Sequence, residues 1–176
     1  GPVTYTVTYT GADSVTLVNT NITLNTSGTA TGAVAVSGTG TASRLVTISS
    51  ITGDGTLGIS LAAATAGDLA GNTAAAAGPS ATFVVDNITP TVTLSTTAPD
   101  PTNAVIPVTA TFSEAVTGFI ITDVVVENGA VGAFSGTGTT YTFSVTPNQN
   151  GAVTIDVAAG MAQDAAGNGN TAALQL

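Results

Sequence analysis

Acidic side chains carry most of the chemistry that this chain could perform. Ten Asp and Glu residues stand against a single cationic side chain, Arg44, and there is no histidine, lysine or cysteine, so the formal net charge is −9. Enzymes need a base that titrates near neutral pH or an activated nucleophile, and the usual suppliers are absent. The composition therefore argues against an enzyme. A glycosidase with paired carboxylates stays formally open, but aromatic residues make up only 5% of the chain and could not line a sugar-binding cleft.

The negative charge also restricts the partners that we expect. Nucleic acid and anionic lipid are bound through Lys and Arg, so the sequence predicts no nucleic-acid binding. Membrane insertion is not expected either, because the longest apolar stretches, such as residues 74–78, are far too short to span a bilayer. Cations are the natural small partners, and an all-oxygen acidic site favours calcium over zinc.

Two similar halves are visible in the sequence. Gly55–Asn72 aligns with Gly151–Asn168, and both segments end in Asp-x-x-Gly-Asn, beginning at Asp68 and at Asp164. The sequence therefore predicts a tandem duplication, with one unit at 1–87 and a second at 88–176. The link between them, residues 85–90, is short and polar, so we expect the units to sit end to end.

Both halves have the alternation of half-buried β-strands. Apolar residues recur at every second position in Tyr5-Thr-Val-Thr-Tyr9 and in Tyr141-Thr-Phe-Ser-Val145, with Thr or Ser between them. Turn-forming clusters rich in Gly, Asn and Asp separate these runs. The pattern predicts an all-β fold of two Greek-key β-sandwiches, with about seven strands in the second. Pro90–Ser95 reads as the opening strand of the second unit, and the first unit lacks its counterpart.

The strand order predicts where the acidic residues meet. In a sandwich, alternate loops emerge at the same pole, so Glu114, Asp123 and Asp164 are expected near one another, with Asp86 arriving from the link. Asn87 and Asn168 would add carbonyl oxygens, and the set is a candidate calcium site. Asp-x-x-Gly-Asn is also a good turn without any ion, and at Asp164 both interpretations stay open. At Asp68 the turn interpretation is favoured, because the acidic residues near Asp68 are weaker candidates for metal ligands.

The order and doubling of these motifs resemble the bacterial Ig-like repeats of large exported surface and adhesin-type proteins. The resemblance rests on Pro90-Thr-Val-Thr-Leu94, Ala110–Phe119, Tyr141–Pro147 and the Asp164–Asn168 motif, together with Gly53–Ile59 and Asp68–Asn72 in the first half. It implies two tandem Ig-like sandwiches, secretion to the bacterial cell surface, neighbouring repeats as partners, and calcium at the junction between domains. The first half departs from the pattern, with Gly11-Ala-Asp-Ser14 in place of the Glu114 loop and Asn21 near the position of Asp123.

Three functions follow as expectations. The first is a structural spacer or stalk repeat, stiffened by calcium at the inter-domain junction. The second is a self-assembling filament module, in which the open sheet edge left by the missing first strand accepts a strand from another chain as a homopolymer contact. The third, a carbohydrate- or protein-binding module, is weaker for sugars because the aromatic platforms are scarce.

Overall fold

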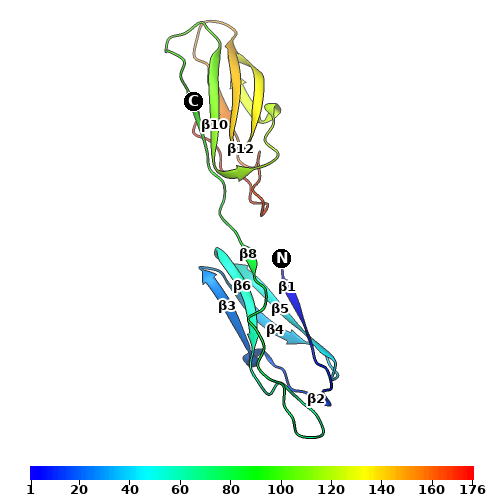
Figure 1. The fold of residues 1–176 in the computed structure, drawn as a ribbon. Coiled ribbons are helices and arrows are strands. Elements are labelled where there is room, and N and C mark those ends of the chain that lie inside the picture. The colour runs from blue at the N-terminus through cyan, green and yellow to red at the C-terminus, as the bar shows by residue number, and fades with distance from the viewer. The chain divides into compact units, whose positions relative to one another are not determined.

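A computed structural model describes all residues from 1 to 176, and the chain divides into two compact units, Gly1–Asn87 and Ile88–Leu176. Apart from two short 3-10 helices, all regular structure is β-strand, and every strand pairing is antiparallel (Figure 1). The prediction of an all-β fold built of Ig-like sandwiches is confirmed. No helix has the length and apolar character needed to cross a membrane.

The first unit is a sandwich of two three-stranded sheets. One sheet has the order β1-β5-β4, and its strands are Val3–Thr8, Ser43–Thr52 and Thr31–Ser37. The other has the order β3-β6-β8, with strands Ile22–Gly28, Gly55–Leu61 and Phe83–Val85. The short pair β2 (Ser14–Val15) and β7 (Ala66–Gly67) and the 3-10 helix η1 (Asn19–Asn21) complete the unit.

The turn from β5 to β6 shows why this sequence needs glycine. Gly53 has a φ of +77°, and a Cβ placed there would lie 2.1 Å from the backbone oxygen of Thr29. Any larger residue would therefore meet both backbone strain and a steric clash. The Gly53-Asp-Gly55 cluster that the sequence marks as a turn is used as one.

The second unit repeats the plan with a different division of strands. One sheet has the order β12-β10-β9, with strands Gly129–Pro147, Ile106–Val116 and Val92–Thr96. The other joins β11 (Val124–Glu127) to β13 (Thr154–Val157), and the 3-10 helix η2 (Ile121–Asp123) precedes β11. The long strand β12 covers the stretch that aligns with both β4 and β5 of the first unit.

Alternating side chains from both sheets fill one core in each unit. In β1 the burial alternates residue by residue, with Tyr5 and Val7 partly buried and the threonines exposed. Each core combines buried residues of both sheets, for example Val46 and Ile48 of β5 with Leu57 and Ile59 of β6. The period-two pattern in the sequence therefore located the buried faces correctly.

The edge strands of the two units differ. In the second unit β10 lies between β12 and β9, with Val92–Thr96 paired to Val108–Phe112. In the first unit β1 pairs with β5 on one side and is the edge strand of its sheet. β1 thus has one hydrogen-bonded neighbour, whereas β10 has two.

Candidate metal centre

The loop that carries Asp164 is held by its own backbone and by that side chain. The Asp164 N–H donates to the carbonyl of Asn168 at 3.1 Å, and the Gly167 N–H donates to the carbonyl of Asp164 at 3.3 Å. Oδ1 of Asp164 accepts the N–H groups of Ala166 and Asn168, each at 2.8 Å, and Oδ2 accepts Nδ2 of Asn168 at 2.8 Å. The carboxylate is therefore the internal cap of a tight turn.

These hydrogen bonds change how Asp164 titrates. Burial acts to raise the pKa of its carboxyl group, since the side chain is only 6% exposed. The bonds from Asn168, Gly167 and Ala166 to the charged form act in the opposite direction and prevail, so the pKa lies below its ordinary value of 3.8. Asp164 is consequently ionised across the physiological pH range.

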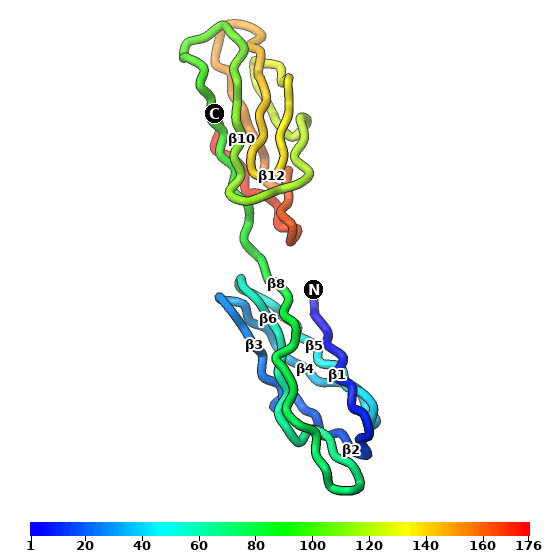
Figure 2. Tube along the Cα trace, viewed as in Figure 1, coloured from blue at the N-terminus to red at the C-terminus, as the bar shows by residue number.

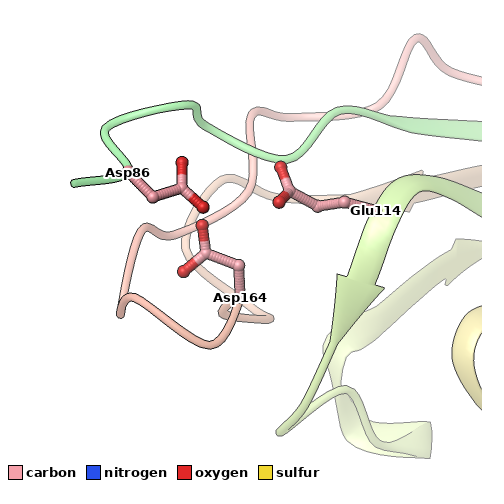
Figure 3. Close-up of side chains that lie close together, drawn as sticks. All are labelled: Asp86, Glu114 and Asp164. Carbon is pink, nitrogen blue, oxygen red and sulfur yellow. The ribbon is translucent and has the colours of Figure 1, made fainter. Parts of the chain in front are cut away.

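Two more carboxylates lie beside Asp164. One oxygen each from Asp86, Glu114 and Asp164 can be chosen such that all three lie within 4.8 Å of one another (Figure 3). Asp86 directly follows β8, Glu114 lies near the end of β10, and Asp164 lies in the loop after β13. Residues distant in the sequence thus bring three negative charges to one place.

The charge and the donor set fit a hard cation. Three carboxylates so close together repel one another unless a cation or protons offset their charge. Arg44, the chain's one cationic side chain, instead donates to the backbone oxygens of Gly40, Ser43 and Val15 in the first unit. Calcium takes roughly six to eight oxygen ligands, and three carboxylates can supply up to about six. Asp164 already accepts three hydrogen bonds out of about four lone-pair sites, so it is best suited to give a single ligand atom from Oδ2.

The other predicted ligands have different surroundings. Asp123 is not one of the clustered carboxylates, and its Oδ2 accepts the N–H of Ile120 at 2.8 Å, which caps η2. The Asn87 N–H donates to Oδ1 of Asp54 at 2.7 Å, and its side-chain amide donates to the oxygen of Gly53 at 2.5 Å. The side-chain nitrogen of Asn168 donates a hydrogen bond to Oδ2 of Asp164.

Asn170 supports the loop that carries Asp164, although the sequence around it does not indicate this role. Asn170 is 2% exposed, and its Oδ1 accepts the N–H of Ala162 at 2.8 Å. Its Nδ2 donates to the oxygens of Ala158 at 3.0 Å and Thr171 at 2.7 Å. Asn170 therefore ties together the two ends of the segment that presents Asp164. Asparagine is common in exposed turns, so its type alone did not distinguish this buried anchor.

Comparison with known proteins bears on the second half of the chain. The family model described as a bacterial Ig-like domain matches residues 86–175, a segment that contains all three clustered carboxylates. No curated protein and no solved structure matches the chain significantly. With that match over more than half of its residues, the chain belongs to the family of bacterial Ig-like domains.

Proposed function

We propose that this chain is a structural spacer repeat of a large bacterial surface protein, exposed outside the cell. The observation that carries the proposal is its membership of the bacterial Ig-like family, whose domains are generally structural modules at cell surfaces. The composition agrees, because histidine, lysine and cysteine, which often serve as enzymatic bases and nucleophiles, are absent. A single Arg and no Lys also leave trypsin-like proteases one site, which suits an exposed stalk.

In this role the working partners are neighbouring Ig-like repeats of the same protein. The spacer holds an adhesive domain away from the cell. The alternation of buried or half-buried Val and Ile with more exposed Thr and Ser gives it a stable core and an uncharged, hydrated face. Adhesion itself would then belong to another part of the parent protein. This division fits a chain whose aromatic side chains are few and, in the second unit, mostly buried.

Calcium would act in this role through Asp86, Glu114 and Asp164. A bound cation offsets the repulsion of the three carboxylates and fastens the residue that follows β8 to two loops of the second unit. The consequence would be a stiffer link at residues 86–89. Support for the ion comes from the all-oxygen donor set of the three carboxylates, which lie within 4.8 Å of one another.

The test is thermal unfolding in millimolar calcium and in EDTA. If calcium is present at about 100 times its Kd, the native state gains roughly 2.7 kcal/mol, which raises the Tm of a domain of this size by on the order of 10 °C. Small-angle scattering of the same samples should report a narrower range of separations between the two units with calcium.

Two variants make that test specific. Glu114→Gln removes one clustered charge and should abolish most of the calcium-dependent rise, whereas Glu127→Gln removes an exposed acid on β11 and should leave it intact. An unchanged Tm in calcium for the wild-type chain would show that the three carboxylates do not bind the ion at that concentration.

A further inference from the structure

Asp86 lies between two residues that are fixed to the first unit. Val85 ends β8, which pairs with β6, and it is 7% exposed in the core (Figure 2). Asn87 is exposed, yet its N–H donates to Oδ1 of Asp54 at 2.7 Å and its side-chain amide donates to the oxygen of Gly53 at 2.5 Å. One of the three clustered carboxylates therefore has an anchored neighbour on each side.

The turn that anchors Asn87, residues 53–55, is itself held by the turn between β3 and β4. The Thr29 N–H donates to the carbonyl of Asp54 at 2.8 Å, and the Asp54 N–H donates to Oγ1 of Thr29 at 3.0 Å. The two turns approach so closely that a Cβ at Gly28 would lie 2.3 Å from the same carbonyl oxygen. The backbone of Asp54 is thus fixed, and its carboxylate is presented by a rigid support.

The hydrogen bond from Asn87 to Asp54 is of a strong kind. Its acceptor is a carboxylate oxygen, and bonds to such oxygens are stronger than those between neutral groups. Asp54 is half-buried and is not one of the clustered carboxylates. Its contact with the chain beside Asp86 therefore gives it a different task from that of a ligand.

Anchoring matters here because Asp86 belongs to a stretch without regular structure. Residues 86–91 lie in no strand or helix. Without the two bonds of Asn87, Asp86 would be attached to the first unit through Val85 alone, and ordering its backbone around an ion would cost conformational entropy. With them, the residue is ordered before an ion binds, which raises affinity.

We propose that Asp54 is a positioning residue for the calcium site, because its carboxylate holds Asn87 and thereby keeps the backbone of Asp86 in the conformation that binds the ion. This inference rests on the proposed calcium site and adds to it a residue outside the three carboxylates. Asn87 contributes as an anchor, through its N–H and its side-chain nitrogen. Loss of the bond to Asp54 therefore weakens calcium binding although no ligand atom is removed.

Calcium titration of the full chain by isothermal calorimetry tests this role. Asp54→Ala removes the acceptor of the Asn87 N–H and should raise the Kd for calcium about tenfold, as residues that orient metal ligands commonly do. Asp54→Asn loses the same charge but keeps a side-chain oxygen that can accept, so its Kd should stay within about threefold of the wild-type value. The pair separates the hydrogen bond from the negative charge.

Tyr9→Phe is the control for a general loss of stability in the first unit. It removes the hydrogen bond from the Tyr9 hydroxyl to Oγ1 of Thr65, which involves neither the turn at residues 53–55 nor the residues beside Asp86. This variant should unfold at a lower temperature in EDTA and still bind calcium like the wild type.

Hydrogen exchange in EDTA, followed by NMR, reports the anchor without any calcium. Protection of the Asn87 amide should fall about tenfold in Asp54→Ala, whereas that of Val46 in β5 should not change. Asn87→Ala removes only the side-chain bond to Gly53, at an exposed position, and should lower protection of its own amide about threefold. This second variant keeps the anchor testable even if Asp54→Ala does not fold.

The outcomes distinguish this inference from the calcium site on which it rests. Equal calcium affinity in Asp54→Ala and the wild type would overturn the inference and leave the site standing. Equal weakening by Asp54→Asn or by Tyr9→Phe would also overturn it, because charge or overall stability would then be the cause. An Asn87 amide without protection in the wild type would show that the anchor does not form in solution. If the wild-type chain bound no calcium at millimolar concentration, the calcium site itself would fail, and the positioning role with it.

Discussion

The two Asp-x-x-Gly-Asn loops, one in each unit, form the same turn in different surroundings. In the first unit the Asp68 N–H donates to the carbonyl of Asn72 at 3.0 Å, and Asp68 accepts the backbone and side-chain nitrogens of Asn72 at 2.8 and 2.7 Å. The corresponding bonds between Asp164 and Asn168 are 3.1, 2.8 and 2.8 Å. Because the side chain bonds to its own loop, the motif needs no ion to form this turn.

The neighbours of the two aspartates differ. Asp68 is partly exposed, and the nearby Asp13 uses Oδ2 to accept the N–H of Leu69 at 2.9 Å. Asp164 is 6% exposed and clusters with Asp86 and Glu114. The motif therefore specifies a turn, whereas any capacity to bind a cation depends on carboxylates from other segments of the chain.

The hydrophobic cores of the two units also differ, because one is largely aromatic and the other aliphatic. In the second unit five aromatic rings form one cluster with centroid separations from 5.1 to 6.4 Å, and the rings belong to Phe112, Phe119, Phe134, Tyr141 and Phe143. The buried core of the first unit is aliphatic. There Tyr5 and Tyr9 donate their hydroxyl groups to Ala81 O and to Thr65 Oγ1, at 3.1 and 2.9 Å.

The largest effect is expected from breaking the aromatic cluster. Phe119 is 4% exposed and contacts three other rings, so Phe119→Ala should lower the free energy of unfolding of the second unit by about 3–5 kcal/mol. Tyr9→Phe in the first unit removes one hydroxyl and should cost only about 1 kcal/mol. Chemical denaturation of both variants measures the difference. Equal losses would mean that the ring of Phe119 contributes no more to stability than the single hydroxyl hydrogen bond of Tyr9.

A somewhat smaller effect is expected from substituting the aspartate of each Asp-x-x-Gly-Asn loop, and the two loops should respond differently to calcium. Asp164→Asn keeps much of the turn but removes a clustered charge, so it should abolish a calcium-dependent rise in Tm of on the order of 10 °C. Asp68→Asn is the matched control and should retain that rise, because Asp68 is not part of the cluster. If Asp68→Asn abolished the rise as well, the ion would bind wherever the motif occurs, and the distinction between the loops would fail.

Much of the fold was predictable from local patterns. The alternation in Tyr5–Tyr9 and Tyr141–Val145 identified strands and buried faces, because the period of a strand is a local property of the chain. The turn at Gly53–Gly55 was predictable for the same reason, since φ values that only glycine adopts readily are set within a few residues.

The site was predictable only in part. Asp86, Glu114 and Asp164 come together as the strand order implied, but Asp123, at the adjacent position in that order, caps η2. Strand order assigns a loop to a pole of the sandwich, and it does not fix where a side chain points. The role of Asn170 depends on tertiary packing, which no local sequence pattern indicates.

Acid should weaken both loops when calcium is absent. The side-chain bond from Asn72 leads the causes that lower the pKa of Asp68 below 3.8; at Asp164 burial raises the pKa, but the hydrogen bonds led by Asn168 lower it further. Since the folded-state values lie below the unfolded ones, this stabilisation is complete above about pH 4 and is lost as the pH falls through the folded-state pKa values. Unfolding measured in EDTA from pH 6 to pH 2 should therefore show a decline that Asp68→Asn and Asp164→Asn each flatten to a similar extent. A variant that leaves the decline unchanged would show that its loop does not bond to the charged carboxylate as described.

The smallest effect is expected at the 3-10 helices η1 and η2, which the two units cap with different residues. The Val18 N–H donates to Oδ1 of Asn21 at 2.9 Å, and the Ile120 N–H donates to Oδ2 of Asp123 at 2.8 Å, so an amide and a carboxylate cap equivalent 3-10 helices. Because Asn and Asp cap helices about equally well, Asp123→Asn should change the free energy of unfolding by less than about 0.5 kcal/mol. It should also leave the calcium-dependent rise in Tm intact. A loss of that rise without a loss of stability would make Asp123 a ligand in solution, because capping alone survives the substitution and only the charge is removed.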